Sequence, residues 1–195
     1  EFAQFMGEFS NAFTQLGNKG HLTIKQKGLE ADDLAAWIVG KKEDFGIDEI
    51  WLISSDKDWD LLIQDKVSRL STVTRKEITL DNWEDHYDVE PDKYLTLKCL
   101  AGDTGDNVPG IAGIGPKRAV SLIEQYGDLF DIYNACPIDS KYKFIQTLNE
   151  NADRLLLNAE LMDLESYSEQ ALIEADMNLE DLSSQIQEYL NEVRD

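Results

Sequence analysis

Seven carboxylates in three short segments are the residues of this sequence best suited to chemistry at a metal ion. They are Glu30, Asp32 and Asp33 in GLEADD, Asp56 and Asp58 in SSDKDWD, and Asp103 and Asp106 in GDTGDN. Hard divalent cations take oxygen ligands, and two such ions about 4 Å apart need several carboxylates in one pocket. Ions held in this way activate water for in-line displacement at phosphorus. We therefore predict a site for two Mg²⁺ or Mn²⁺ ions, with metal-activated water as the nucleophile.

Each acidic segment also has a purely structural interpretation. Acids in the first turn of a helix are favoured by the helix dipole, which suffices for the first segment. Aspartates that follow a strand often cap a helix, and Asx-turns account for aspartates in glycine-framed loops. These alternatives stay open for each segment taken alone. The coincidence of three such segments favours the metal site.

The glycine-rich stretch GIAGIGPKRAV, residues 110–120, predicts a phosphate-binding turn. Its informative residues are three glycines, a proline and two cations, namely Gly110, Gly113, Gly115, Pro116, Lys117 and Arg118. The glycines permit a tight turn and close approach of another backbone, and the proline suits the first position of a helix. The free amides of that helix start, together with the two cations, would face an anion. An ordinary glycine-rich turn between helices is the alternative.

The charge distribution limits where a nucleic acid could bind. A formal net charge of −21 repels nucleic acid in bulk. Residues 150–195 hold 13 acidic residues and only two arginines, whereas the basic residues concentrate earlier in the chain. We interpret most of the acidic tail as a solvated surface. One face of the remainder can still attract phosphate, above all when bound metal ions neutralise the central acids.

Other features argue against a membrane or export role. No apolar run approaches the roughly 20 residues that span a bilayer, and the chain does not open with a signal-peptide pattern. The two cysteines, Cys99 and Cys136, form no metal-ligand pattern. We expect no membrane partner, reduced thiols and a cytoplasmic location.

Hydrophobic periodicity predicts the elements that must position these residues. In chain order they are a helix over 1–17, a strand over 21–27, a helix over 29–46, a buried parallel strand over 48–55, strands over 69–74 and 76–80, and helices from Asp81 onward with breaks near Pro91, at 102–115 and near Pro137. Strands and helices that alternate before a helical region indicate an α/β fold with a parallel-sheet core and a helical appendage. The second acidic segment follows the apolar strand directly, at the end of a strand where ligands of α/β sheets lie.

Three stretches in this order, GLEADDLAA, LISSDKDWDLLI and LAGDTGDNVPGIAGIGPKRAV, resemble the 5′ nuclease superfamily. That family includes flap endonucleases and the 5′-to-3′ exonuclease domain of bacterial DNA polymerase I. The stretches DKVSRLSTVTRKEITL and YLTLKCLAGD are most similar to bacteriophage flap endonucleases. The resemblance implies a PIN/5′-nuclease-like core and a helix–three-turn–helix DNA-binding region. For a phage-encoded protein, the location would be the host cytoplasm.

The resemblance also implies roles for particular residues. All seven carboxylates would be metal ligands, and all of them except Asp33 would be catalytic. Glu30 and Asp32 match the family's first pair of acids, and Asp33 matches an acid adjacent to that pair. Asp56 and Asp58 match the pair that follows the central strand, and Asp103 and Asp106 match the late acids. The residues that would contact DNA are Lys98, Gly110, Gly113, Gly115, Lys117 and Arg118. Backbone carbonyls near Ile111 and Ile114 would hold a monovalent cation such as K⁺ against duplex phosphates.

The resemblance further implies a division of the chain into four segments. These are the end of a helical arch region (1–20), an α/β metal-site core (21–80), the helix–three-turn–helix region (81–160) and an acidic C-terminal helical segment (161–195). The family's N-terminal strands, with two more aspartate ligands, and most of its arch would precede Glu1. We therefore expect a fold that is incomplete at the N-terminus, either a fragment or a subunit that a separate N-terminal chain completes.

The leading hypothesis is the C-terminal part of a metal-dependent, structure-specific 5′ nuclease. It would hydrolyse phosphodiesters in branched or 5′-ended DNA, as a flap endonuclease or 5′-3′ exonuclease in replication or repair. One alternative is a duplex-DNA-binding module without catalysis. Another is an RNase H-like relative that removes primers from an RNA/DNA hybrid, because it would share every motif named above.

Overall fold

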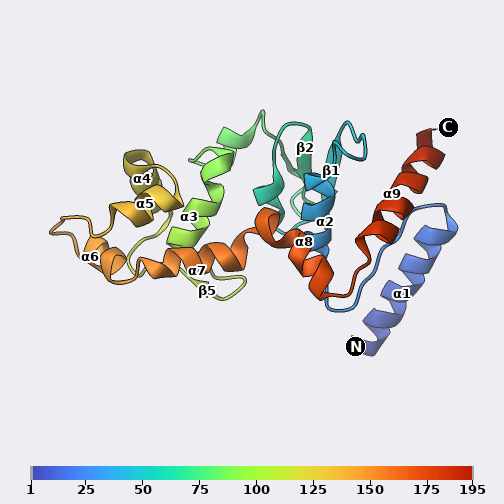
Figure 1. Cartoon of the computed structure of the whole chain (residues 1–195), viewed down its shortest axis with the longest axis horizontal. Helices are drawn as coiled ribbons and strands as arrows, with labels where there is room; N and C mark the ends of the chain where they lie inside the picture. Colours follow the sequence, from blue (N-terminus) through green and yellow to red (C-terminus); the bar gives the residue numbers. More distant parts are fainter. Residues whose placement is uncertain (1, 195) are drawn as a thin grey trace. The chain divides into compact units, whose positions relative to one another are not determined.

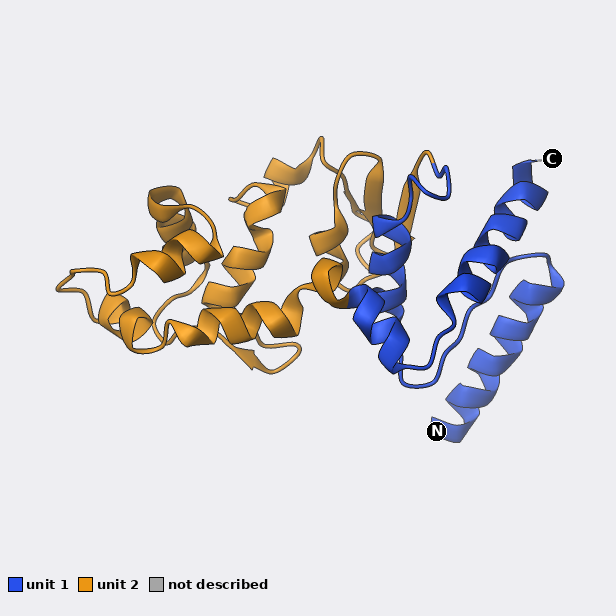
Figure 2. Cartoon of the chain, in the orientation of Figure 1, with its two compact units in different colours: residues 1–47, 168–195 blue, residues 48–167 orange. Residues whose placement is uncertain are grey.

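The computed structural model describes residues 2–194, which divide into two compact units (Figures 1 and 2). Unit 1 joins the N-terminal part of the chain, up to Ile47, to the C-terminal part from Ser168. Unit 2 is the continuous stretch 48–167. No helix in the described part of the chain is both long and apolar enough to span a bilayer. The four functional segments expected from the sequence stay a prediction.

Unit 1 is helical. Its helices are α1 (Phe2–Asn18), α2 (Ala31–Gly40), most of α8 (Leu164–Glu174) and α9 (Leu179–Arg194). Its core joins the two chain segments, because Trp37 and Phe45 pack with Leu172, Leu182 and Ile186. The Trp37 and Phe45 rings meet edge to face, with centroids 5.9 Å apart.

Unit 2 carries all the strands of the described chain and most of its helices (Figure 1). Its elements are β1 (Ile50–Ile53), η1 (Asp58–Leu62), β2 (Val67–Leu70), β3 (Glu77–Ile78), η2 (Trp83–Asp85), η3 (Pro91–Lys93), α3 (Tyr94–Ala101), β4 (Gly102–Asp103), β5 (Val108–Pro109), α4 (Pro116–Tyr126), α5 (Leu129–Ala135), α6 (Lys143–Glu150) and α7 (Asp153–Met162). The fold is therefore mixed α/β and mostly helical.

The main sheet has the order β1-β2-β3. Strands β1 and β2 are parallel, with Ile50 opposite Val67, and β3 is antiparallel to β2. The buried strand predicted over 48–55 is present as the shorter strand β1. The expectation that both of its faces are buried is wrong. Trp51 is 41% exposed and Ile53 56% exposed, because β1 is an edge strand in the described sheet and one of its faces carries no cover.

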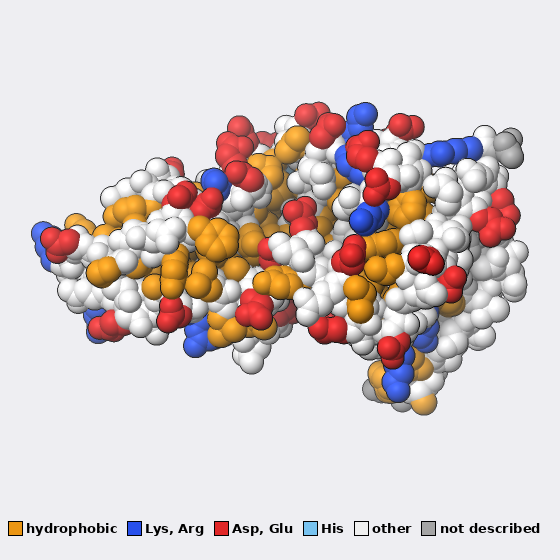
Figure 3. Space-filling view, viewed as in Figure 1, with side chains coloured by type: hydrophobic (Ala, Val, Ile, Leu, Met, Phe, Trp, Pro, Cys, Tyr) orange, Lys and Arg blue, Asp and Glu red, His pale blue; other side chains and the backbone are white. Residues whose placement is uncertain are grey.

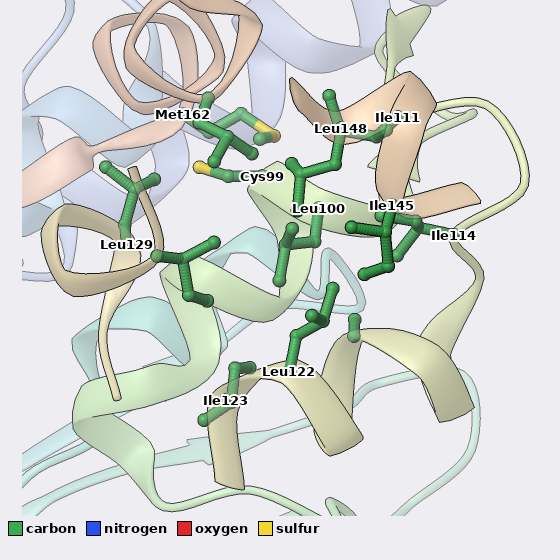
Figure 4. Close-up of a cluster of buried hydrophobic side chains, with 13 residues drawn as sticks. Cys99, Leu100, Ile111, Ile114, Leu122, Ile123, Leu129, Ile145, Leu148 and Met162 are labelled. Carbon is green, nitrogen blue, oxygen red and sulfur yellow. The ribbon is translucent and has the colours of Figure 1, made fainter. Parts of the chain in front are cut away.

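A core of 13 buried side chains holds the helices of unit 2 together (Figure 4). Leu100 of α3 lies among Leu122 of α4, Leu148 of α6 and Ile111 and Ile114 of the turn between β5 and α4. The side chains of the two isoleucines thus anchor the turn in this core, as the spacing of apolar residues in the sequence suggests. Gly113, Gly115 and the two cations are left exposed.

Two sequence predictions in unit 1 need correction. Residues 21–26 form no strand, because Leu22 and Ile24 pack against the Trp37 core and no described strand lies beside them. The helix predicted to stop at Gly46 ends at Gly40, and the chain reaches Gly46 through turns. The predicted first helix is confirmed, with a small shift at its end. The helical pattern predicted from Asp81 is confirmed from Tyr94 onward, whereas residues 81–93 hold only the short 3-10 helices η2 and η3.

Candidate metal centre and phosphate-binding turn

Three carboxylates from two segments of unit 2 converge on one point. Asp58 begins η1 just after β1, Asp103 lies in β4, and Asp106 lies in the turn that joins β4 to β5. Each offers one carboxylate oxygen, and these oxygens all lie within 4.8 Å of one another. An all-oxygen group of this size and charge suits a hard divalent cation.

Lys98 of α3 neutralises part of this charge. Its side chain is buried, forms a short ion pair with Asp58, and lies 3.0 Å from a carboxylate oxygen of Asp103. Burial alone would lower the pKa of Lys98, but the bonds to the two carboxylates outweigh burial and raise it. Burial likewise favours a higher pKa for Asp103, but the bond from Lys98 and the Gly105 amide prevail and lower it. The Lys98 ammonium and the Asp103 carboxylate therefore stay charged.

Asp106 is the member of the cluster whose charge is repelled most by a neighbouring carboxylate. A hydrogen bond to Asp58 and repulsion by its charge raise the pKa of Asp106 to about 6. A proton on Asp106 thus relieves repulsion between two carboxylates that would otherwise both be ionised. A divalent cation would relieve the same repulsion, so the donor set fits such an ion.

A buried ion pair supports the segment that carries Asp58. Asp60 is 1% exposed and accepts two hydrogen bonds from the Arg69 guanidinium of β2, one of 2.7 Å. Arg69 also donates to the Ser54 carbonyl at 2.9 Å, and the Tyr87 hydroxyl donates to Asp60. Sequence reasoning missed this network. An arginine inside the otherwise uncharged strand VSRL was the available signal, because a buried guanidinium requires a carboxylate partner.

The other predicted ligands are not members of this three-carboxylate group. The Asp56 carboxylate accepts a 3.0 Å hydrogen bond from the Asp58 amide just before η1, and it is not part of the three-carboxylate cluster. Glu30, Asp32 and Asp33 gather at the start of α2 in unit 1, where burial and then Asp32 raise the pKa of Asp33. Their share in a metal site stays a prediction.

The backbone geometry of the turn requires glycine at two positions. A Cβ at Gly110 would lie 2.3 Å from the carbonyl carbon of Ala101, so only glycine permits this approach of two backbones. Gly113 adopts a left-handed φ of +85°, which glycine accepts freely. A Cβ at Gly115 would meet nothing within 4 Å. Pro116 is the first residue of α4, as predicted.

The predicted DNA contacts divide into two groups. Lys117 and Arg118 are exposed at the start of α4, and Arg118 donates to the Gly113 carbonyl. Lys98 lies instead among the carboxylates of the cluster. The Ile111 carbonyl, a predicted ligand of a monovalent cation, accepts a 2.9 Å hydrogen bond from the Ile114 amide. The cation site itself stays a prediction.

Comparisons with known proteins show the family to which the chain is similar. Residues 89–189 match the family described as 5′-3′ exonuclease, C-terminal SAM fold. The flap endonuclease of Escherichia phage T5 is 41% identical over 170 residues, which are 87% of this chain and 58% of that protein. A crystal structure of the T5 D15 protein with metal ions aligns with a TM-score of 0.85 and 36% identity, covering 99% of this chain and 70% of that one.

A second solved structure shows a related chain with nucleic acid. The T5 D15 flap endonuclease in a pseudo-enzyme-product complex with DNA and metal ions aligns with a TM-score of 0.84 and 37% identity. That alignment covers 97% of this chain and 68% of the T5 chain. The chain described here thus spans 58% of the length of its curated T5 relative.

Proposed function

We propose that this chain, which belongs to the 5′-3′ exonuclease family, contributes metal ligands and a duplex-DNA contact to a structure-specific 5′ nuclease. The whole enzyme would hydrolyse phosphodiesters at 5′ ends or flaps of DNA and leave a 5′-phosphate. The convergence of Asp58, Asp103 and Asp106 within 4.8 Å carries the proposal. A purely structural role for these aspartates would not require their carboxylates to meet.

The proposed metal ligands are Asp58, Asp103 and Asp106, with further carboxylates from Asp56 and from Glu30, Asp32 and Asp33. Additional ligands from outside these 195 residues, in the same or a separate polypeptide, belong to the proposal. Divalent ions, Mg²⁺ or Mn²⁺, would supply charge stabilisation for displacement at phosphorus. Lys98 pairs with Asp58 and Asp103 and lowers the pKa of Asp103, so the Asp103 carboxylate can bind a cation without first losing a proton.

The same part of the chain would bind the substrate backbone. β5 leads directly into the turn of residues 110–115, and α4 follows with Lys117 and Arg118 exposed. We propose that α3, this turn and α4 form a helix–three-turn–helix that grips consecutive phosphates without reading bases. A K⁺ ion at the turn carbonyls would add to this grip.

Metal binding tests the catalytic half of the proposal. In a Mn²⁺ titration followed by electron paramagnetic resonance, we expect Asp58→Asn to weaken binding by roughly 10-fold or more, since even indirect ligand partners contribute 10–100-fold. Glu124→Gln removes the same charge from an exposed position of α4 and should bind Mn²⁺ as the parent does. Equal affinity of Asp58→Asn and the parent would overturn the metal site.

Cleavage distinguishes a nuclease from a DNA-binding module. In an assembly that also supplies the ligands from outside these 195 residues, in cis or as a separate chain, a 5′-flap DNA incubated with Mg²⁺ should be cut near the junction. Asp58→Asn in that assembly should abolish cutting while duplex affinity is retained. Duplex binding without any Mn²⁺ site at the cluster would instead support the binding module. A matched RNA/DNA hybrid in the same assay separates flap cutting from primer removal.

A further inference from the structure

Next to the turn, four side chains form a continuous stack of cations and aromatic rings. The Arg118 guanidinium lies 4.5 Å from the centroid of the Phe144 ring. The Phe144 ring stacks with Tyr142 at 5.8 Å and an interplanar angle of 24°, and the Lys141 ammonium lies 5.9 Å from the Tyr142 centroid. The stack therefore links the start of α6 to the start of α4.

The stack is joined to the turn itself. Arg118 donates to the Gly113 carbonyl, and a Cβ at Gly113 would meet the Phe144 Cβ at 3.4 Å. A hollow of about 320 Å³ lies alongside, lined by Arg118, Phe144 and the polar side chains of Ser121, Gln125 and Ser140, among others. Tyr142, which also lines it, is 58% exposed. Such exposure of an aromatic ring between cations is not explained by core packing.

Several basic side chains lie near this stack, in a chain that is acidic as a whole. Lys117, Arg118, Lys141 and Lys143 are all exposed in this region, and Asp139 is the acid among the residues that line the hollow. Figure 3 shows basic side chains, with acidic ones beside them, at the end of unit 2 where α6 lies. In a chain with net charge −21, these four exposed cations, of which Arg118 lines the hollow, can attract an anion locally.

We propose that residues 140–144, at the entrance to α6, are a second contact for the backbone of duplex DNA, continuous with the turn. This inference rests on the proposed function. Lys141 and Lys143 would contact phosphates beyond those gripped by the turn, independently of sequence. The aromatic rings hold Lys141 and Arg118 in place before binding, which lowers the conformational entropy lost when DNA binds.

Salt dependence of binding tests this contact. We would measure the affinity of a fluorescein-labelled DNA duplex by anisotropy, in Ca²⁺ and over a series of KCl concentrations. The double variant Lys141→Gln/Lys143→Gln should bind more weakly, and its slope of log K against log [KCl] should fall by about 2, because each lost phosphate contact removes roughly 0.9. Lys76→Gln/Lys93→Gln carries the same charge change away from the stack and is the matched control.

The aromatic part of the stack has its own test. Tyr142→Phe should keep the parent affinity, whereas Tyr142→Ala should lose about three-fold, as expected for an exposed cation–π contact of 0.5–1 kcal/mol. Because residues 141–143 are exposed, all variants should keep the parent circular dichroism and Mn²⁺ affinity.

The outcomes separate this inference from the proposed function. If Lys117→Gln weakens binding but Lys141→Gln/Lys143→Gln behaves like the control, the second contact is refuted and the turn stands. If Lys117→Gln also binds like the control, or the parent binds no duplex, the DNA-binding role of the turn fails and this inference fails with it.

Discussion

At the scale of single residues, the candidate metal centre depends on a balance between Lys98 and three carboxylates. Lys98 pairs with Asp58 and Asp103, and it leaves Asp106 to face Asp58 with little compensation. The raised pKa of Asp106 is the consequence. Without a divalent cation the carboxylates of Asp58 and Asp106 repel each other, and a bound cation would offset this repulsion.

This repulsion predicts how the free energy of unfolding depends on pH. The pKa of Asp106 is about 6 in the fold and about 3.9 in an unfolded chain. The folded state therefore holds the extra proton between these values, and stability of the metal-free protein should fall as pH rises from 4 to 6. Asp106→Asn removes the charge, so its melting temperature in EDTA should exceed the parent's at pH 7.5.

The two melting temperatures should converge near pH 4, where Asp106 of the parent is protonated. Added Mn²⁺ should raise the parent more than the variant. Glu124→Gln serves as the control, since it removes an exposed charge outside the cluster. An advantage of Asp106→Asn that is equal at both pH values would contradict the assigned repulsion.

At the scale of elements, the short β4–β5 hairpin places the acids and the turn together. β4 pairs with β5 in antiparallel register, Gly102 opposite Pro109, and this brings the Gly102 and Gly110 backbones into contact. The Asn158 amide of α7 donates to the carbonyls of Cys99 and Pro109, at 2.9 and 3.0 Å. The hairpin is thus fixed to α3 and α7, and it holds Asp103 on one side and the turn on the other.

The close approach at Gly110 predicts a large effect of a single methyl group. Gly110→Ala would place its Cβ 2.3 Å from backbone carbon, so it should cost roughly 3 kcal/mol or more of unfolding free energy in urea. Gly115→Ala lies in the same turn but meets no atom within 4 Å, and should cost about 1 kcal/mol or less as a change at a helix N-cap. Similar losses for both variants would refute the packing argument.

At the scale of the whole molecule, the two units are built differently. Unit 2 is one continuous stretch with its own buried core and contains Asp58, Lys98, Asp103 and Asp106. Unit 1 needs both ends of the chain, because Trp37 packs against Leu172 and Leu182. The two units therefore differ in their tolerance of truncation.

This difference predicts the behaviour of two truncated chains. Residues 48–167 expressed alone should unfold cooperatively on heating, as followed by circular dichroism, because the stretch is continuous and has its own core. Residues 1–167 lack the segment that completes the unit 1 core, and their N-terminal part should lose its fold. Limited proteolysis measures this loss. Stable protection of residues 1–47 in that chain would contradict the division.

The sequence alone determined the features that depend on a few neighbouring residues. Glycine, proline and apolar spacing act locally, so they predicted the turn of residues 110–115, the start of α4 at Pro116 and the helices that follow Asp81. Residue chemistry likewise predicted that aspartates near residues 58 and 103 suit a divalent cation. The family resemblance was evident from these same stretches.

Only the tertiary structure decided which side chains meet. It joined Asp58 to Asp103 across 45 positions of sequence, gave both of them Lys98 as a partner, and buried Asp60 against Arg69. It also left residues 21–26 without a strand partner, despite their alternating pattern. The physical reason is that helix and turn signals act within one or two turns of backbone, whereas ion pairs and sheet pairing depend on how distant segments pack.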